Sequence, residues 1–248
     1  MNWPGGKCFA PETLLDGRGR RICWAWVLES RKWPVQNAAG WSGVMTMPRV
    51  LSLDDQGRLL IDPPEEFERL RYDHQEQDSL DLKPDAELVL QDVQGTELEL
   101  ALEIDPGQAK EVGIIVRRSP DGADPAKAER TVIVYAPGQK KLTIDTERSS
   151  LDPDITNDYP VILMNDKVKR REVRRQEAPL ELAAGEPLRL RIFLDRSILE
   201  VYANRRQCVT QRIYPTRRDS VGVALFANGG AAQVRRLDAW RVMPTNAH

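Results

Sequence analysis

Two carboxylates stand five residues apart in the segment DRSILE, which runs from Asp195 to Glu200 and carries Arg196 beside the first acid. Two carboxyl groups about 5–5.5 Å apart can cleave a glycosidic bond, with one acting as the nucleophile and the other as the proton donor. The segment also reads as a tight turn, where a structural ion pair and a turn cap explain the same residues. We expect the structural role, and no other paired carboxylates suggest a pocket. The sequence therefore predicts no catalytic residue in this chain.

Other reactive side chains are scarce. His74 and His248 are the only histidines, so the sequence offers almost no histidine that could act as a general acid, a general base or a nucleophile. The three cysteines, Cys8, Cys23 and Cys208, are odd in number and far apart, unlike a disulfide framework or a zinc site. Cys8 and Cys23 either face each other across neighbouring strands or are small buried hydrophobic residues. Without a phosphate-binding loop or a dinucleotide fingerprint, we expect no cofactor and no metal.

The composition is that of a soluble globular protein. The chain has 248 residues, of which 30% are charged and 41% hydrophobic, and its formal net charge is −2. This charge argues against nucleic-acid or membrane partners, and we read the basic segment Lys167–Arg175 as a solvated face. The first ten residues lack the apolar core of a signal peptide, and no apolar run approaches the ~20 residues of a membrane helix. We therefore expect a cytoplasmic protein.

The elements that would position any site are β-strands almost throughout, so the sequence predicts an all-β fold. Residues 1–63 contain turn-forming breaks between short strands, and four antiparallel strands in about sixty residues make one blade of a propeller. The breaks are DGRG, the stretch Pro34–Gly40, and DDQG. The expected strands are Lys7–Leu14, Arg20–Leu28, Gly43–Leu53 and Arg58–Ile61.

A connector is expected at residues 64–81. The segment Pro64–Tyr72 begins with proline and two acids and places Phe67 and Leu70 on one helical face, which predicts a short helix. The segment His74–Asp81 is polar and is expected to be a linker.

Residues 82–248 are expected to form an antiparallel β-sandwich. Glu97–Ile104 and Leu188–Asp195 alternate leucine or isoleucine with mostly charged residues, so each strand has one buried and one solvated face. The other expected strands are Val112–Arg117, Arg130–Ala136, Leu142–Thr146, Leu199–Ala203, Gln207–Arg212, Val221–Asn228 and Ala232–Arg241.

Three segments carry a resemblance to a known family. FAPETLLDGRGRRICWAWV (residues 9–27) and WSGVMTMPRVLSL (41–53) resemble the last propeller blade of the β-fructosidases, glycoside hydrolase family 32. LRIFLDRSILEVYANRRQCVTQRIYP (190–215) resembles the core strand pair of that family's C-terminal sandwich. The family includes invertase, levanase and inulinase and combines a five-bladed propeller with a sandwich. The resemblance implies that this chain supplies the fifth blade, the connector and the whole sandwich.

The family's catalytic motifs do not occur in this sequence. Its nucleophile, transition-state stabiliser and acid/base lie in NDPNG, RDP and EC motifs, and none of the three is present among the 248 residues. The resemblance therefore implies a truncated relative of enzymes that hydrolyse terminal β-fructosides of sucrose, levan or inulin, not catalytic on its own. The alternative is a non-catalytic β-sandwich module that binds fructan or forms oligomers.

The fifth blade of such a protein would supply one wall of a sugar site. By resemblance, Trp26 matches a tryptophan that faces fructose, Phe9 stands in the place of a tyrosine and lacks its hydroxyl, and Glu12 stands where some members have glutamine. Aromatic faces suit the C–H patches of a sugar ring. The alternatives are that Trp24 or Trp26 packs between blades and that Glu12 is merely exposed at a strand end. Fructose-containing sugars are the expected ligands.

A blade without neighbouring blades is also expected to associate with other chains. Its apolar residues would be open to water on both faces, which favours self-association. We expect a homo-oligomer formed through the blade, or a partner chain that supplies the missing blades; a monomer would mean that the blade folds back onto its own sandwich. The residues expected on this surface are Ile22, Val27, Val44, Met45 and Val50.

Overall fold

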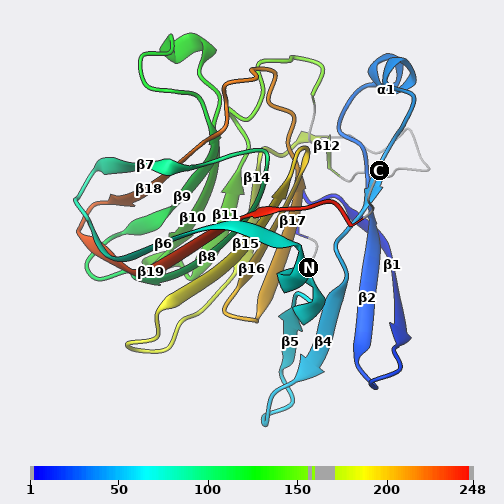
Figure 1. Cartoon of the computed structure of the whole chain (residues 1–248), viewed down its shortest axis with the longest axis horizontal. Helices are drawn as coiled ribbons and strands as arrows, with labels where there is room; N and C mark the ends of the chain where they lie inside the picture. The colour runs from blue at the N-terminus through cyan, green and yellow to red at the C-terminus, as the bar shows by residue number, and fades with distance from the viewer. Residues whose placement is uncertain (1–2, 156–157, 160–170, 246–248) are drawn as a thin grey trace.

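The computed structural model describes residues 3–155, 158–159 and 171–245. Its strands form one five-stranded sheet, two six-stranded sheets and a two-stranded pair, and every strand pairing between them is antiparallel. Figure 1 shows the small sheet standing beside two larger, stacked sheets. The prediction of an all-β chain built from a blade-like sheet and a sandwich is confirmed.

The blade is a meander whose turns are closed by aspartates. Asp16 accepts hydrogen bonds from the backbone N–H groups of Arg18 and Arg20, and Asp54 does the same for Gln56 and Arg58. The prediction of one continuous strand over residues 43–53 is wrong, because two separate strands lie there. The strand order is β1 (Cys8–Leu15), β2 (Arg21–Val27), β4 (Arg49–Leu53) and β5 (Leu59–Asp62), with β3 (Val44–Met45) also paired to β2.

The break expected at residues 34–40 contains a helix that the sequence interpretation missed. Helix α1 (Trp33–Ala39) has Pro34 in its first turn, and Gly40 caps its end at φ 74°, a left-handed conformation that glycine adopts without strain. Proline and glycine are turn signals as well as helix-boundary signals. In so short a segment, the positions of proline and glycine alone do not distinguish a turn from a short helix.

The connector is shorter than predicted. A 3₁₀ helix, η1 (Glu65–Leu70), lies where the helical turn was expected. The prediction of a linker over residues 74–81 is wrong, because these residues belong to the twelve-residue strand β6 (Arg71–Leu82). Strand β6 pairs with β19 at one edge of a sheet, and its polar composition suits an edge that faces water.

The sandwich consists of two sheets of six strands each. The first has the order β14 (Arg175–Pro179), β11 (Lys141–Asp145), β10 (Thr131–Ala136), β9 (Glu111–Arg118), β18 (Gly222–Asn228) and β7 (Ala86–Gln94). The second has the order β17 (Gln207–Arg212), β16 (Ile198–Ala203), β15 (Leu188–Asp195), β8 (Glu97–Asp105), β19 (Ala232–Val242) and β6. Strands β12 (Asp158–Tyr159) and β13 (Arg171–Glu172) pair separately, and two short 3₁₀ helices, η2 (Pro125–Lys127) and η3 (Pro137–Gln139), complete the elements.

The main core lies between the two large sheets. The alternating residues predicted to point inward on β8 and β15 are all buried there. Burying such side chains contributes most of the free energy that stabilises a fold of this kind. These residues are Leu98, Leu100, Leu102, Ile104, Leu188, Leu190, Ile192 and Leu194.

One face of the blade packs against the sandwich of the same chain. Ile61 of β5 joins a buried apolar cluster with Phe193 and Tyr202, which lie on the outer side of β15 and β16. The expectation that Ile22 and Val27 are open to solvent is wrong, since they are 6% and 0% exposed. Met45 is 56% exposed, so the opposite face of the blade remains uncovered at this point.

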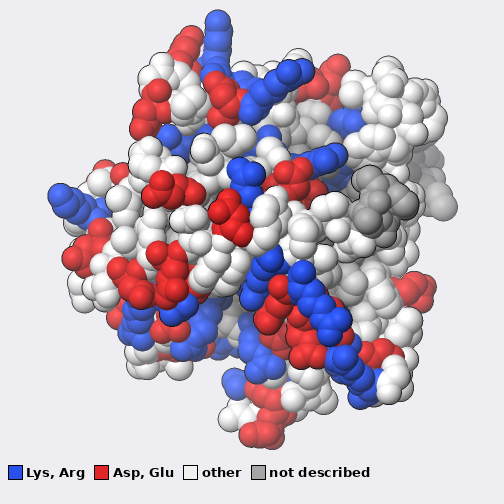
Figure 2. Space-filling view, viewed as in Figure 1, with Lys and Arg blue, Asp and Glu red and all other residues white. Residues whose placement is uncertain are grey.

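The surface carries both signs of charge. On the face shown in Figure 2, lysine and arginine are interspersed with aspartate and glutamate. Residues 167–170 of the basic segment lie outside the described residues; within the described part, Arg174 pairs with Glu172 and Arg175 pairs with Asp145. No helix among the described residues has both the length and the apolar character needed to span a membrane.

Candidate functional site

The three residues predicted to bind sugar lie together on the face of the blade that points away from the sandwich. Phe9 is the cross-strand partner of Trp26, and Glu12 is the partner of Trp24. A bulge between Phe9 and Glu12, with Ala10 at φ 47°, inserts one extra residue into β1. Without it, residues three apart on a strand would point to opposite sides. The bulge therefore aligns Phe9, Glu12 and Trp26 on one face.

Phe9 and Trp26 form an exposed aromatic pair. Their ring centroids are 6.3 Å apart in an edge-to-face arrangement, and the residues are 42% and 43% exposed. Trp24 lies two residues from Trp26 on β2, so both indoles point to the same face, and Trp24 is half-buried. An exposed aromatic pair beside a carboxylate can stack against a sugar ring and accept a hydrogen bond from a hydroxyl.

Gly43 makes room for the Trp26 side chain. A Cβ atom at Gly43 would lie 2.2 Å from Trp26 Nε1, and the φ of Gly43 is +70°. Any other residue would therefore displace the indole and strain the backbone. This position was missed in the sequence interpretation, although a glycine two residues after Trp41 is a signal of a close backbone approach.

Asp195 and Glu200 lie in different surroundings, one exposed and the other buried. Glu200 is buried opposite Phe193, and its Oε1 accepts from Nη2 of Arg49 at 3.0 Å. Asp195 is exposed at the turn between β15 and β16, where Arg196 pairs with Glu97 at 2.8 Å. The expected structural role of the two acids agrees with these contacts, but their ionic partners are not the ones their spacing suggested.

Arg49 lies at the centre of a buried polar cluster between the blade and the sandwich. Its Nη2 donates to Glu200, to the Thr210 hydroxyl and, at 3.8 Å, to Cys8 Sγ. Arg49 and Glu200 are 2% and 0% exposed, so this is a fully buried ion pair. Since the partners are 151 residues apart in sequence, no local pattern indicates the contact.

A small cavity opens beside this cluster. Its volume is about 270 Å³, and its lining is mostly apolar apart from the guanidinium and two thiols. Cys8 and Cys23 both line it, but they are not cross-strand partners, because Cys8 pairs with Val27 and Cys23 pairs with Thr13. The lining residues are Cys8, Phe9, Ala10, Pro11, Cys23, Ala25 and Arg49.

A second charged cluster joins Glu29, which follows the blade strand β2, to side chains at the end of the sandwich strand β17. Glu29 accepts hydrogen bonds from the side chains of Arg31 and Tyr214, and Trp41 covers the Arg31 guanidinium, which lies 4.2 Å from the ring centroid. Burial alone would raise the pKa of Glu29, but the hydrogen bonds from Arg31 and Tyr214 outweigh it and lower the pKa to about 2. Arg212 is buried beside Glu29, 4.9 Å from the Tyr214 ring centroid.

One group of side chains among the described residues has the composition of a metal site. His74, Glu76 and Asp238 place their ligand atoms within 4.8 Å of one another. Arg236 already binds both carboxylates, with contacts of 2.8 Å to Glu76 and 2.6 Å to Asp238. His74 Nε2 donates to Asp238 Oδ1 at 2.8 Å, and the imidazole ring stacks on Trp240. This arrangement is a surface ion-pair network.

Comparison with known proteins identifies the chain's relatives. Residues 66–241 match the profile "Glycosyl hydrolases family 32 C terminal", and residues 2–64 match "Glycosyl hydrolases family 32 N-terminal domain". An insoluble β-fructofuranosidase isoenzyme, CWINV5 of Arabidopsis thaliana, is 28% identical over 95% of this chain, and a sucrose-6-phosphate hydrolase of Staphylococcus xylosus is 29% identical over 93%.

A solved structure shows the same fold over a partial length. Fructan 1-exohydrolase IIa from Cichorium intybus superposes with a TM-score of 0.78 at 20% identity, and the match covers 97% of this chain but 48% of that protein. The two relatives in sequence are likewise covered to only 45% and 41% of their own lengths. The chain thus spans less than half the length of the curated relatives it matches. With both of the family's domain profiles matched in order along a blade and a sandwich, this chain belongs to glycosyl hydrolase family 32.

Proposed function

We propose that this chain is the C-terminal part of a protein acting on β-fructosides and that it does not hydrolyse them on its own. The proposal rests on one observation above all. Glu12 is the only acidic residue of β1 and β2, the strands that carry the Phe9–Trp26 pair. A retaining glycosidase needs two carboxyl groups, and these two strands supply at most one of them.

The proposed role of the blade is to form one wall of the sugar site. Phe9 and Trp26 would contact the apolar side of a fructosyl ring, and Glu12 would accept from a ring hydroxyl. The relatives that carry names of fructoside-hydrolysing enzymes are more than twice as long as the matched region. The nucleophile, the stabiliser and the acid/base would come from the part of the propeller that this chain does not contain.

A hydrolysis assay tests this proposal. Purified chain is incubated with sucrose, inulin and levan, and release of reducing sugar is followed beside an active β-fructofuranosidase as the positive control. We expect no release above the buffer blank. Turnover that co-elutes with the chain during size-exclusion chromatography would contradict the proposal.

A binding module without catalysis is the second candidate, favoured by the exposure of Phe9 and Trp26. Its test is a calorimetric titration with sucrose and short fructans. Wild-type chain should give saturable heats, Trp26→Ala should abolish them, and Trp33→Ala should not, since Trp33 is 68% exposed on α1 and serves as a matched control. Flat heats with the wild-type chain would remove this candidate.

We also propose that the uncovered blade face associates with another chain. Strand β1 is an edge strand with seven of its eight residues exposed, and Met45 extends the apolar surface beside Trp26. An unpaired edge next to apolar side chains favours sheet extension. A second copy is the occupant available to the purified chain, so light scattering should give a dimer or larger. A mass that stays monomeric at high concentration would contradict this.

A further inference from the structure

The strongest unassigned feature is the thiol of Cys8 beside the Arg49 guanidinium. Cys8 lines the cavity of about 270 Å³ and is half-buried, whereas Cys23 and Cys208 are 3% and 0% exposed. Arg49 Nη2 points at Cys8 Sγ from 3.8 Å. Reactive cysteines are found in electropositive and partly exposed surroundings of this kind.

The guanidinium is held in place, and one of its donors has no acceptor. Its Nη2 is fixed by Glu200 and Thr210, so Arg49 cannot swing away from the thiol. Its Nε is buried and has no hydrogen-bond acceptor among the described residues. Glu200 offsets part of the positive charge, which leaves the cluster suited to a small neutral molecule that accepts hydrogen bonds.

We propose that Cys8 is a modification site for hydrogen peroxide or a small alkyl hydroperoxide. The peroxide enters the cavity and accepts hydrogen bonds from Arg49. The Cys8 thiolate attacks one peroxide oxygen, the S–O bond forms and the O–O bond breaks. The thiolate sulfur is oxidised to a sulfenic acid, and the leaving oxygen departs as water or an alcohol after taking up the proton that the thiol lost. The peroxide is the oxidant and nothing else is consumed.

The other two thiols provide an internal contrast. Burial raises the pKa of both Cys23 and Cys208 above the ordinary value for a thiol, although the nearby Arg49 acts in the opposite direction. Both side chains are also more buried than that of Cys8, although Cys23 lines the same cavity. Oxidation should be selective for Cys8 in the folded chain.

The test compares folded and unfolded protein. The chain is exposed to hydrogen peroxide with dimedone, which traps sulfenic acids, and adducts on the three cysteine peptides are measured over time by mass spectrometry. The same reaction in urea gives the rate for Cys8 without its surroundings, and a cysteine peptide in both buffers corrects for urea itself. We expect Cys8 to react about tenfold faster in the folded chain, and about tenfold faster than Cys23 or Cys208.

Exposure alone predicts the opposite order, because a half-buried thiol should react more slowly when folded than when unfolded. A folded-state rate for Cys8 that is equal to or below the unfolded rate would overturn the proposal. Cys8→Ser should remove the adduct, and Arg49→Lys, which keeps the charge but loses the fork of donors, should bring the folded rate down towards the unfolded one. If Arg49→Lys does not fold, the comparison of Cys8 oxidation rates in the folded and unfolded wild-type chain still tests the proposal.

Discussion

The buried ion pair between Arg49 and Glu200 should be the most sensitive point of the blade–sandwich junction. Replacing Glu200 with glutamine preserves the shape of the side chain but removes the negative charge. Arg49 is 2% exposed, so its charge would then be left inside the protein with only neutral contacts, namely Thr210, Cys8 and the new amide. Leaving one member of a buried pair without its partner costs about 3–5 kcal/mol. We expect Glu200→Gln to lower the free energy of unfolding by about 3 kcal/mol, at the low end because glutamine still accepts a hydrogen bond.

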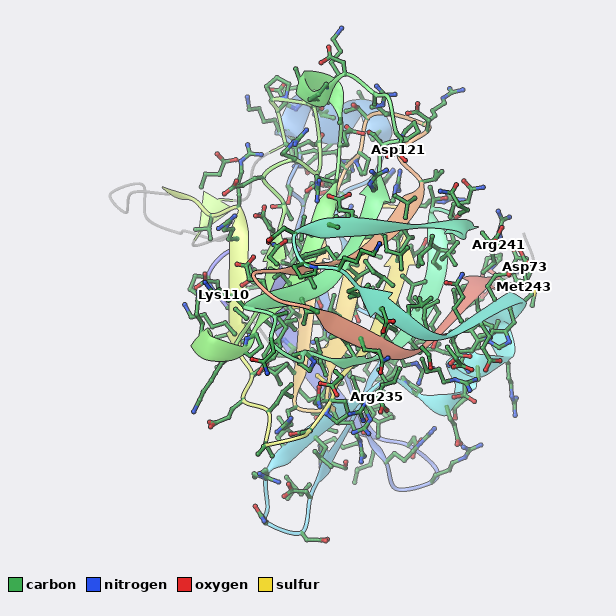
Figure 3. All side chains as sticks on the ribbon, turned by 90° about the vertical axis from the view of Figure 1, so that its left-hand side faces the viewer. Asp73, Lys110, Asp121, Arg235, Arg241 and Met243 are labelled. Carbon is green, nitrogen blue, oxygen red and sulfur yellow. The ribbon has the colours of Figure 1, made fainter. Side chains whose placement is uncertain are left out.

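Urea unfolding followed by tryptophan fluorescence measures this change. Five of the six tryptophans lie within the first 41 residues, so the signal reports mainly on the blade. The control is Arg235→Gln. Arg235, labelled in Figure 3, has a side chain that is 41% exposed and pairs with Glu103 and Asp105. An exposed pair contributes about 0–1 kcal/mol, so the control should unfold almost as the wild type does.

The double variant Arg49→Met, Glu200→Leu separates charge from packing. Replacing both members of a buried pair with apolar residues of similar volume is often neutral. We expect it to recover most of the stability lost in Glu200→Gln. The reasoning would be refuted if Glu200→Gln unfolded within 1 kcal/mol of the control, or if the double variant were less stable than the single one.

Two further changes test other parts of the structure. The pKa of Glu29 falls from 4.5 to about 2 on folding, so its ionised form stabilises the fold above about pH 4.5, and this contribution is lost as the pH falls towards 2. The difference in unfolding free energy between wild type and Glu29→Gln should therefore shrink over that pH range. A difference that does not depend on pH would argue against this role of Glu29. Gly113 is the third residue of β9, where a Cβ would stand 2.0 Å from the Ile133 carbonyl oxygen, so Gly113→Ala should cost at least about 2 kcal/mol in urea unfolding. Gly17→Ala, with open space around the site, should be neutral, and equal effects of the two substitutions would contradict the close approach.

The strands that could be predicted are those whose burial alternates along the chain. Strands β8 and β15 carry a leucine or isoleucine at alternate positions, and their inward residues are all buried. Strand β6 has no such pattern, since it is a polar edge strand held by the backbone ladder to β19, and it was therefore misread as a linker. Helix α1 has no buried residue, so it offers no helical periodicity for the sequence to display.

Part of the candidate site could likewise be predicted from the sequence, and part could not. The resemblance of residues 9–27 to a propeller blade indicated Phe9, Glu12 and Trp26, and the strand register places all three on one face. The bulge that aligns them depends on the left-handed backbone at Ala10, which the sequence does not signal. The Arg49 cluster joins β4 to β16 and β17 across the interface of two units, so only the tertiary structure reveals it.

We propose that no carboxylate of this polypeptide acts as the nucleophile in fructoside cleavage. Retaining enzymes form a covalent glycosyl intermediate on that carboxylate. The most direct measurement is the intact mass of the purified chain after an acid quench during incubation with an activated aryl β-fructoside. We predict a mass identical to that of the untreated chain. A fraction of the protein heavier by one fructosyl group, mapped by peptide analysis to an aspartate or glutamate of this chain, would contradict the account.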